Sequence, residues 1–212
     1  KEEYALYDGV IASTDAGTTP VSNYRNWTNE YLVPHSTAKY AKNVRDSYMV
    51  GALARFNNNH DQLSSRAKKA SAALGLKAPC YNPFMNTVVQ VVEAVHAVDE
   101  SIRLIDEVLD KGLKEEDRRI LLKAGKGVGA VDVPRGILFH DYTYDKNGIC
   151  REANCIIPTN QNHANIQKDM EALLPQILGQ SQDEIRLKLE MLVRAYDPCI
   201  SCSTHLLKVK FV

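Results

Sequence analysis

Two cysteines and a histidine lie close together near the end of the chain, in the sequence Asp197-Pro198-Cys199-Ile200-Ser201-Cys202-Ser203-Thr204-His205. Aspartate is a good N-cap and proline a good first helical residue, so the sequence predicts a helix that begins at Cys199. Cys199, Cys202 and His205 would then share one helix face, because residues three apart lie on the same side. Thiolates and imidazole are metal ligands. A buried pair of cysteines with a capping histidine is the alternative, and an isolated C-x-x-C pattern is compatible with both.

A second candidate for chemistry is Arg135, which follows a segment with three glycines two apart, Gly125, Gly127 and Gly129. This spacing resembles a phosphate-binding loop, but the G-x-x-x-x-G-K-[ST] order is absent, so a nucleotide loop is rejected. Pro134 restricts the backbone before Arg135 and glycine frees it afterwards, so the arginine is held on a loop in one pose. A rigid arginine suits an anionic or charge-separated site, and a surface arginine in a turn is the alternative.

Composition describes a globular chain with balanced charge. The 212 residues are 44% hydrophobic, which is enough for one domain covering residues 1–212. Lys plus Arg and Asp plus Glu both number 26, so charge gives no case for nucleic acid. Short apolar runs and the N-terminal sequence Lys1-Glu2-Glu3-Tyr4 contain no membrane span and no signal-peptide pattern, so we expect a cytoplasmic protein. Five cysteines, an odd number, indicate thiols and metal ligands rather than a disulfide framework.

Helices are expected to position these residues. Residues 84–109 form the clearest one, with a stripe at steps of three and four made of Val88, Val91, Val92, Val95, Val98, Ile102, Ile105 and Leu109. His96 lies beside this stripe and is expected to be a packed or surface residue. Further helices are expected at residues 158–178 and 182–196, and the second of these leads directly into the cysteine motif.

Strands are expected in smaller number. Residues 137–144 and 150–157 flank the turn sequence Asp145-Lys146-Asn147-Gly148 and predict a hairpin. Residues 4–12 predict a strand that ends in a turn at 14–17. The predicted fold class is therefore mainly α with small antiparallel β elements, an α+β fold.

The remaining segments are assigned to short helices. Residues 26–31 predict a helical turn stopped by Pro34, and two helices separated by a loop are expected at residues 51–56 and 63–74. Residues 113–124 are charged and predict a helix with no visible chemistry. The chain lacks an initiator methionine, which suggests a piece of something longer.

Three motifs in order resemble the large, catalytic subunit of nickel-iron hydrogenases: P-R-G at residues 134–136, I-P-T-x-x-N at 157–162 and D-P-C-x-x-C-x-x-H at 197–205. The resemblance covers essentially the whole chain and implies the helical fold of that subunit. The flanks of the last motif are most similar to the cytoplasmic, NADP-linked sulfhydrogenase-type branch.

The resemblance implies a role for each metal-ligating residue. Cys199 matches the terminal nickel thiolate, and Cys202 matches the thiolate that bridges nickel to an iron carrying carbon monoxide and cyanide. His205 matches the ligand of a separate magnesium or iron ion. Soft thiolates suit the nickel and iron positions.

The resemblance also implies the chemistry, which is the reversible heterolytic cleavage of dihydrogen. Arg135 matches an arginine over the open metal position, and Asp197 matches the acid that pairs with it. Pro134 and Thr159 match residues that contact the cyanides. A thiolate or Arg135 takes the proton, and Cys199 is the first choice because a guanidinium stays protonated.

The chain departs from the family pattern in two places. The family carries a second cysteine pair in an N-terminal R-x-C-G-x-C motif, and no such pair is present here, since the three other cysteines have the wrong spacing. We therefore expect the C-terminal half of a split or truncated large subunit, active only with the missing pair. Asp132-Val133 also stands where the family usually has Glu-Ala.

The implied partners form a hetero-oligomer. They are an iron-sulfur small subunit that takes the electrons, the N-terminal part of the large subunit, and flavin- or NADP-linked diaphorase subunits that deliver electrons to NADP or a related soluble acceptor. Two other functions stay open. One is a structural zinc-binding protein, because two cysteines and a histidine suit tetrahedral zinc. The other is a non-catalytic, hydrogenase-like scaffold subunit of an electron-transfer complex.

Overall fold

The computed structural model describes residues 3–4 and 6–203, with only the backbone at residues 202 and 203. The described elements, in chain order, are β1 (Ile11–Ser13), β2 (Gly17–Thr19), η1 (Val21–Asn23), α1 (Tyr24–Trp27), β3 (Asn29–Tyr31), β4 (Tyr40–Lys42), α2 (Ala52–Asn59), η2 (His60–Gln62), α3 (Ser65–Ala73), α4 (Met85–Lys111), β5 (Gly125–Val133), β6 (Gly136–Tyr144), β7 (Cys150–Ile156), α5 (Pro158–Ile177), α6 (Gln182–Ala195) and α7 (Ile200–Ser203). Every described strand pair is antiparallel. The predicted class, mainly α with small antiparallel sheets, is therefore confirmed.

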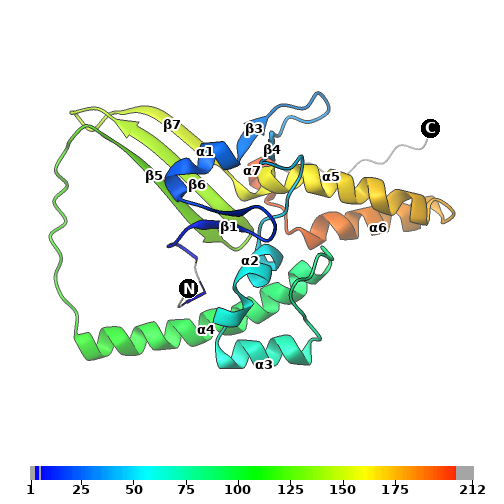
Figure 1. The fold of residues 1–212 in the computed structure, drawn as a ribbon, viewed down its shortest axis with the longest axis horizontal. Coiled ribbons are helices and arrows are strands. Elements are labelled where there is room, and N and C mark those ends of the chain that lie inside the picture. Colours follow the sequence, from blue (N-terminus) through cyan, green and yellow to red (C-terminus); the bar gives the residue numbers. More distant parts are fainter. Residues whose placement is uncertain (1–2, 5, 204–212) are drawn as a thin grey trace.

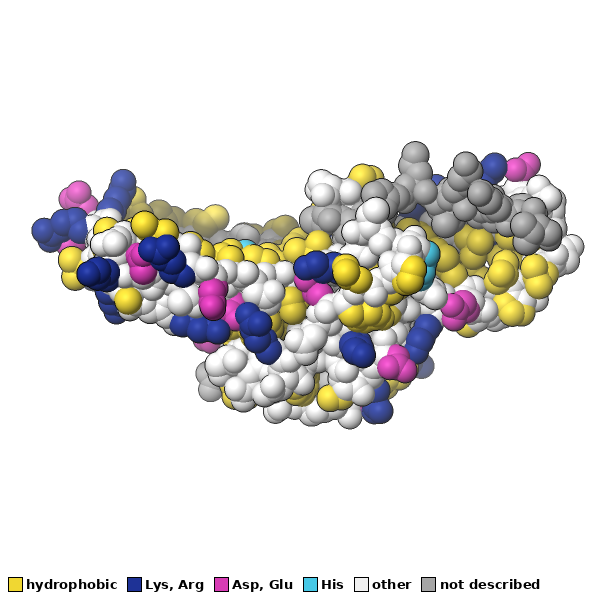
Figure 2. All heavy atoms as spheres, turned by 90° about the horizontal axis from the view of Figure 1, so that it is seen from above, with side chains coloured by type: hydrophobic (Ala, Val, Ile, Leu, Met, Phe, Trp, Pro, Cys, Tyr) yellow, Lys and Arg dark blue, Asp and Glu magenta, His cyan; other side chains and the backbone are white. Residues whose placement is uncertain are grey.

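The arrangement in space places a sheet and two groups of helices around the middle of the chain. In Figure 1 the sheet of β5, β6 and β7 lies opposite the α5–α6 pair, and α4 runs along the base with α3 beside it. Acidic and basic side chains are interspersed on the face that Figure 2 shows, in keeping with the balanced composition. Among the described residues there is no helix with the length and apolar character that a membrane crossing requires.

The three-stranded sheet is the element that carries Arg135. Residues 134 and 135 alone connect β5 to β6, so that Val133 lies opposite Gly136. One face of the sheet packs on Tyr24, whose ring stacks on Phe139 with centroids 5.1 Å apart. The Tyr24 hydroxyl also donates a hydrogen bond of 2.9 Å to buried Asp141. This packing fixes the sheet and therefore the turn at its end.

A second core joins α2, α3 and α4. Val89 and Val92 of α4 are fully buried against Leu53 and other residues of α2 and α3. His96 is a packed residue of this region, because it is buried and its Nδ1 accepts the Ser64 N–H at 3.1 Å. The two helices expected near residues 51–56 and 63–74 are confirmed as α2 and α3.

The α5–α6 pair leads the chain into the cysteine motif. A capping box starts α6, in which Ser181 and Glu184 each bind the other's backbone N–H. Leu192 and Tyr196 pack on Ile166 of α5. Both helices follow the prediction, because their apolar periodicity and their caps are local signals.

Most of the apolar stripe along the predicted helix α4 is exposed. The helix forms as expected, and Val92 is buried, but five of the eight stripe residues are exposed, with exposed fractions between 49% and 73%: Val91, Val98, Ile102, Ile105 and Leu109. The physical reason is that α2 and α3 cover the side of α4 that carries Val89, Val92 and His96. The periodicity therefore predicted the helix correctly but not the side that this chain covers.

The helix expected at residues 113–124 is wrong. The chain leaves α4 at Gly112, where φ is +72°, and residues 112–124 form a connection without regular secondary structure, which Figure 1 shows as the long trace between α4 and β5. Leu113, Ile120 and Leu121 are exposed. A helix of about 12 residues is marginal in water without a packed face, and no described element packs against these side chains.

Two N-terminal predictions need adjustment. The strand expected at residues 4–12 is limited to β1, although it does form the predicted hairpin, with β2. The helical turn expected at 26–31 ends at Trp27, and residues 29–31 are β3. Pairing with β4, which sets Tyr31 opposite Tyr40, satisfies the backbone better than one more helical turn.

Gly136 offers a test of the turn that carries Arg135. Its φ is +135°, and a Cβ there would lie 2.4 Å from the Val50 Cγ2 atom. Gly136→Ala should lower the free energy of unfolding by about 1–3 kcal/mol or more, because the residue would hold a strained backbone and overlap Val50. Urea denaturation of the chain measures the change. Gly125→Ala is the control, since a Cβ there meets no atom within 4 Å. Equal effects of the two substitutions would contradict a tightly constrained turn.

Candidate active site

Arg135 lies on a turn whose backbone is pressed against the residues before α2. Gly51, with φ of +116°, is so near that a Cβ would lie 3.1 Å from the Arg135 carbonyl oxygen. The side-chain amide of Asn162 binds both sides of Val50, accepting its N–H at 2.8 Å and donating to its carbonyl at 3.2 Å. The turn therefore rests on a backbone segment that is itself hydrogen-bonded.

The structure brings Arg135 and Asp197 together. The Nε of Arg135 donates to the Asp197 carbonyl oxygen at 2.8 Å, and its Nη2 lies 3.4 Å from the Asp197 Oδ1 atom. Both side chains stay partly exposed. Two contacts on one residue fix the direction of the guanidinium.

The local structure at Asp197 differs from the prediction of an N-cap. Its φ is +49°, a left-handed conformation that aspartate tolerates better than most residues, and its N–H donates to the Arg194 carbonyl at 2.9 Å. Asp197 thus closes α6, and α7 begins at Ile200 rather than at Cys199. The positive φ turns the chain so that the Asp197 carbonyl faces Arg135.

Cys199 is held by its backbone. Its N–H donates to the Thr159 hydroxyl at 3.1 Å, and its Sγ lies 3.4 Å from the Ser201 hydroxyl. The thiol is half-buried. Cys202 lies in α7, but its side chain is outside the described residues, and so is the whole of His205.

Thr159 belongs to an unusually polar and buried first turn of α5. Pro158 starts this helix, a position that suits its missing N–H, and the next four side chains, Thr159, Asn160, Gln161 and Asn162, are all buried. Gln161 donates to the Ile137 carbonyl at 2.6 Å on β6. The first turn of α5 therefore ties together the sheet, the segment before α2 and the cysteine motif.

Sequence reasoning missed the buried arginine behind the turn. Arg55 of α2 is 3% exposed, and its Nη1 and Nη2 donate to the carbonyls of Val133 at 2.8 Å and Pro134 at 3.0 Å. Glu93 of α4 binds the same guanidinium through both oxygens, at 2.7 and 2.6 Å, and Asp132 binds it at 2.6 Å. An arginine among the apolar residues of a short helix was the only sequence signal.

Two carboxylates around one guanidinium affect the ionisation of Asp132. Burial raises the pKa of Asp132 to about 6, and the negative charge of Glu93 adds to this, while Arg55 opposes it. Asp132 stands where the resemblance predicts glutamate, so the shorter acid reaches Arg55 directly in this chain.

The described side chains do not form a complete metal site by themselves. Among the side chains that the structure describes, those of residues 3–4 and 6–201, no group of three or more His, Cys, Asp or Glu has a geometry that could hold a metal ion. Cys199 contributes one soft thiolate donor beside Thr159 and the Arg135 turn. A soft sulfur donor of this kind suits nickel or iron, and the two other predicted ligands, the side chains of Cys202 and His205, lie outside the described side chains.

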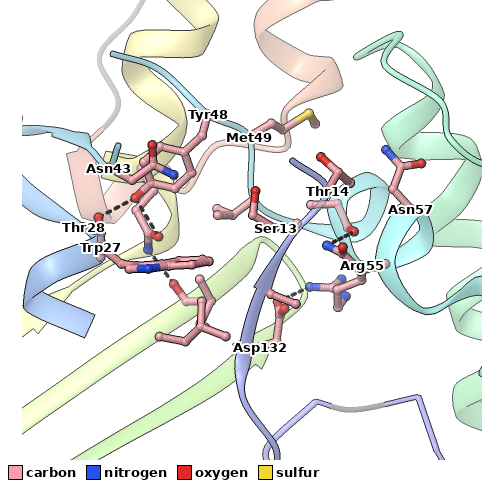
Figure 3. A pocket seen from close by; sticks show the side chains of 18 of the residues that line it. Ser13, Thr14, Trp27, Thr28, Asn43, Tyr48, Met49, Arg55, Asn57 and Asp132 are labelled. Carbon is pink, nitrogen blue, oxygen red and sulfur yellow. Dashed lines mark hydrogen bonds and ion pairs between the residues drawn. The ribbon is translucent and has the colours of Figure 1, made fainter. Parts of the chain in front are cut away.

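A large cavity lies next to the site without containing its cysteine. Its volume is about 810 Å³, and it opens between the β1–β2 hairpin, α2 and the sheet, where Arg55 and Asp132 meet in Figure 3. Tyr48 in its wall contacts the Thr28 hydroxyl at 2.5 Å and donates to Gln161 at 3.0 Å. Neither Arg135 nor Cys199 lines it.

Comparison with known proteins assigns the chain to a family. A family model described as nickel-dependent hydrogenase matches residues 35–205. The chain therefore belongs to the nickel-dependent hydrogenase family, and the resemblance stated from the motifs is confirmed.

Individual relatives agree. The chain is 33% identical to the alpha subunit of sulfhydrogenase 1 from Pyrococcus furiosus over 208 residues, which is 98% of this chain and 48% of that protein. It is 40% identical over 218 residues to one of the subunits of the F420-non-reducing hydrogenase of Methanothermobacter marburgensis, covering 94% of this chain and 45% of that protein. The chain thus spans about half the length of the curated relatives it matches.

A solved structure shares the fold. The NAD+-reducing [NiFe]-hydrogenase in the H2-reduced state superposes with a TM-score of 0.77, covering 96% of this chain and 48% of that chain. The sequence identity is 24%, so this likeness concerns the fold.

The raised pKa of Asp132 predicts a pH dependence of stability. An unfolded aspartate has a pKa of about 4, and the folded value is about 6. The native state therefore binds a proton that the unfolded state has lost between these values, so stability falls as pH rises from about 4 to about 6. Asp132→Asn should flatten the free energy of unfolding in this window, measured by urea denaturation at several pH values.

Asp145→Asn is the matched control for this experiment. Hydrogen bonds from the backbone, chiefly from Ile149, lower the pKa of Asp145, so its contribution is lost only below about pH 4. A wild-type slope that Asp132→Asn leaves unchanged would contradict the raised pKa.

Proposed function

We propose that this chain is the C-terminal half of a nickel-iron hydrogenase large subunit that catalyses the reversible heterolytic cleavage of dihydrogen. The observation that supports this is the convergence of two motifs 62 residues apart: Arg135 binds Asp197, two residues before Cys199. The turn that carries the guanidinium therefore contacts the segment that carries the thiol. Arg135 stays charged and orients the reacting partners, and the Cys199 thiolate accepts the proton, because thiolates are basic near neutral pH and guanidinium groups are not.

The metals in this proposal are those of the family. Cys199 and Cys202 would hold a nickel and an iron with carbon monoxide and cyanide ligands, and His205 would hold a magnesium or iron ion. When bound, the nickel-iron pair supplies the electron-accepting chemistry. Pro134 and Thr159 would contact the diatomic ligands of that iron, and the contacts of their polar atoms with Arg55 and Cys199 hold these two residues in place.

The missing half of the subunit is the partner that we propose for the exposed stripe of α4. Val91, Val98, Ile102, Ile105 and Leu109 recur at steps of seven, four, three and four, which is the spacing of a seam between two helices packed lengthwise. The relatives are about twice as long as this chain, and in this proposal an N-terminal part with the second cysteine pair of the family pattern would supply that helix.

Electron transfer requires further subunits. An iron-sulfur small subunit would receive the electrons, in line with the multisubunit naming of the relatives, and flavin-containing diaphorase subunits would pass them to NADP or a related acceptor. One relative in part of the chain is the beta subunit of the NAD-reducing hydrogenase HoxS of Cupriavidus necator, 31% identical over 126 residues. A cytoplasmic location remains part of the proposal.

Infrared spectroscopy and metal analysis of the purified complex test the proposed function. The wild-type complex should contain stoichiometric nickel and show carbonyl and cyanide stretching bands. Cys199→Ser should lose nickel, bands and dihydrogen uptake, because a hydroxyl is a poor ligand for these metals. Cys155→Ser, which removes an exposed thiol on β7, should keep all three. Stoichiometric zinc without bands would instead identify a zinc protein, and bound partners without any metal would identify a scaffold.

A charged substitution in the α4 stripe tests whether the stripe binds the N-terminal part of the subunit. Ile102→Glu should weaken association with the N-terminal half of the subunit by about 100-fold or more, because burying an unpaired carboxylate costs several kcal/mol. Leu104→Glu is the control: this leucine is similarly exposed, 47% against 49%, but lies two residues further, off the stripe. Co-purification and titration of the two halves measure the effect. Equal losses for both variants would contradict the stripe as the seam.

A further inference from the structure

A polar face of α4 connects both partners of the Arg135–Asp197 contact. Asn86, Gln90 and Glu93 follow one another at steps of four and three, so they share one side of the helix. This side is distinct from the apolar stripe. Each of the three side chains binds a different segment of the site.

Gln90 binds Asp197 directly. Its Nε2 donates to the Asp197 Oδ2 atom at 3.0 Å, while the other carboxylate oxygen, Oδ1, faces Arg135 at 3.4 Å. The carboxylate is therefore held from two sides. Rotating it toward any other partner breaks at least one of these contacts.

Asn86 fixes the chain just before Asp197. It is 3% exposed, donates to the Ala195 carbonyl at 2.9 Å and accepts the Leu53 N–H at 3.0 Å. The end of α6 is thereby fastened to the same helix as the Asp197 side chain, one turn away from Gln90.

Glu93 reaches Arg135 through Arg55. The guanidinium of Arg55 makes five hydrogen bonds, two of them to Glu93 and one to the carbonyl of Pro134, the residue before Arg135. A rigid bidentate pair of this kind leaves the guanidinium little freedom. The helix α4 thus holds both partners of the contact in position. It holds Arg135 through Glu93 and Arg55, and it holds Asp197 through Gln90.

We infer that Gln90 is a positioning residue, which orients the Asp197 carboxylate so that Asp197 in turn orients Arg135. The expected effect of Gln90 on kcat rests on the proposed function, whereas its effect on the orientation of Arg135 does not. Gln90 touches neither the thiol nor the arginine, so its effect passes through Asp197 alone.

Gln90→Met tests the inference, because it keeps the length of the side chain and removes the donor. In the assembled hydrogenase, kcat should fall about tenfold, since small misplacements of a catalytic group are costly. The KM for dihydrogen, the nickel content and the infrared bands should stay as in the wild type. Gln90→His restores an N–H donor and should recover most of the lost kcat.

Gln167→Met is the matched control. Gln167 also donates from its amide to a carboxylate, that of Glu171, at 2.9 Å, but it does so on the exposed face of α5. This variant should keep the wild-type kcat. An unchanged kcat in Gln90→Met, or an equal loss in both variants, would overturn the inference.

A second measurement is independent of catalysis. In the chain itself, solvent exchange of the Arg135 Nη protons, which face the Asp197 carboxylate, should be about tenfold faster in Gln90→Met than in the wild type, as expected when a hydrogen bond that orients a charged group is lost. Nuclear magnetic resonance follows this signal, which Arg135→Lys assigns. A wild-type complex without carbonyl bands would refute the proposed function, whereas unchanged exchange would refute the role of Gln90.

Discussion

The burial of one guanidinium organises this chain. Arg55 is almost completely removed from solvent, and a buried charge is tolerated only where counter-charges and hydrogen bonds replace water. Glu93 and Asp132 supply the charges, and the carbonyls of residues 133 and 134 accept hydrogen bonds from the remaining N–H groups of the guanidinium. Since these groups come from α2, α4 and β5, the requirement to satisfy Arg55 sets where the helices stand relative to the sheet. The turn at the end of β5 is placed as a consequence.

The other side of the site is fixed by backbone groups. Thr159 receives the amide of Cys199, Asn86 binds the end of α6, and Asn162 binds both polar atoms of Val50. Directional hydrogen bonds suit this region better than apolar packing, because they determine orientation as well as distance. The sheet and the two helical cores are rigid, and hydrogen bonds from buried amides and hydroxyls hold Arg135, Asp197 and Cys199 in fixed positions relative to them.

Local signals made much of this readable from the sequence. The periodicity of α4, the cap of α6 and the turn at residues 145–148 depend on neighbouring residues, and the three motifs pointed to Arg135, Thr159, Asp197 and Cys199. The contacts of Arg55 and Gln90 could not be read in the same way, because they join segments that are 38 to 107 residues apart. The same holds for the exposed stripe and for residues 113–124. A hydrophobic pattern reports that a face will be covered, but it does not say whether the cover belongs to this chain.

The exposed apolar stripe and the polar face with Gln90 and Glu93 lie on different sides of the same helix, α4. A partner helix that seats its side chains between those of α4 fixes the rotation of α4 about its own axis, and that rotation carries the amide of Gln90 and the carboxylate of Glu93 with it. In the proposed assembly, docking of that partner and alignment of the arginine turn would be linked through α4, whose 27 residues span about 40 Å at about 1.5 Å for each residue. The described chain already holds Arg135, Asp197 and Cys199 in place, and in the proposed assembly the docked helix would set the rotation of α4.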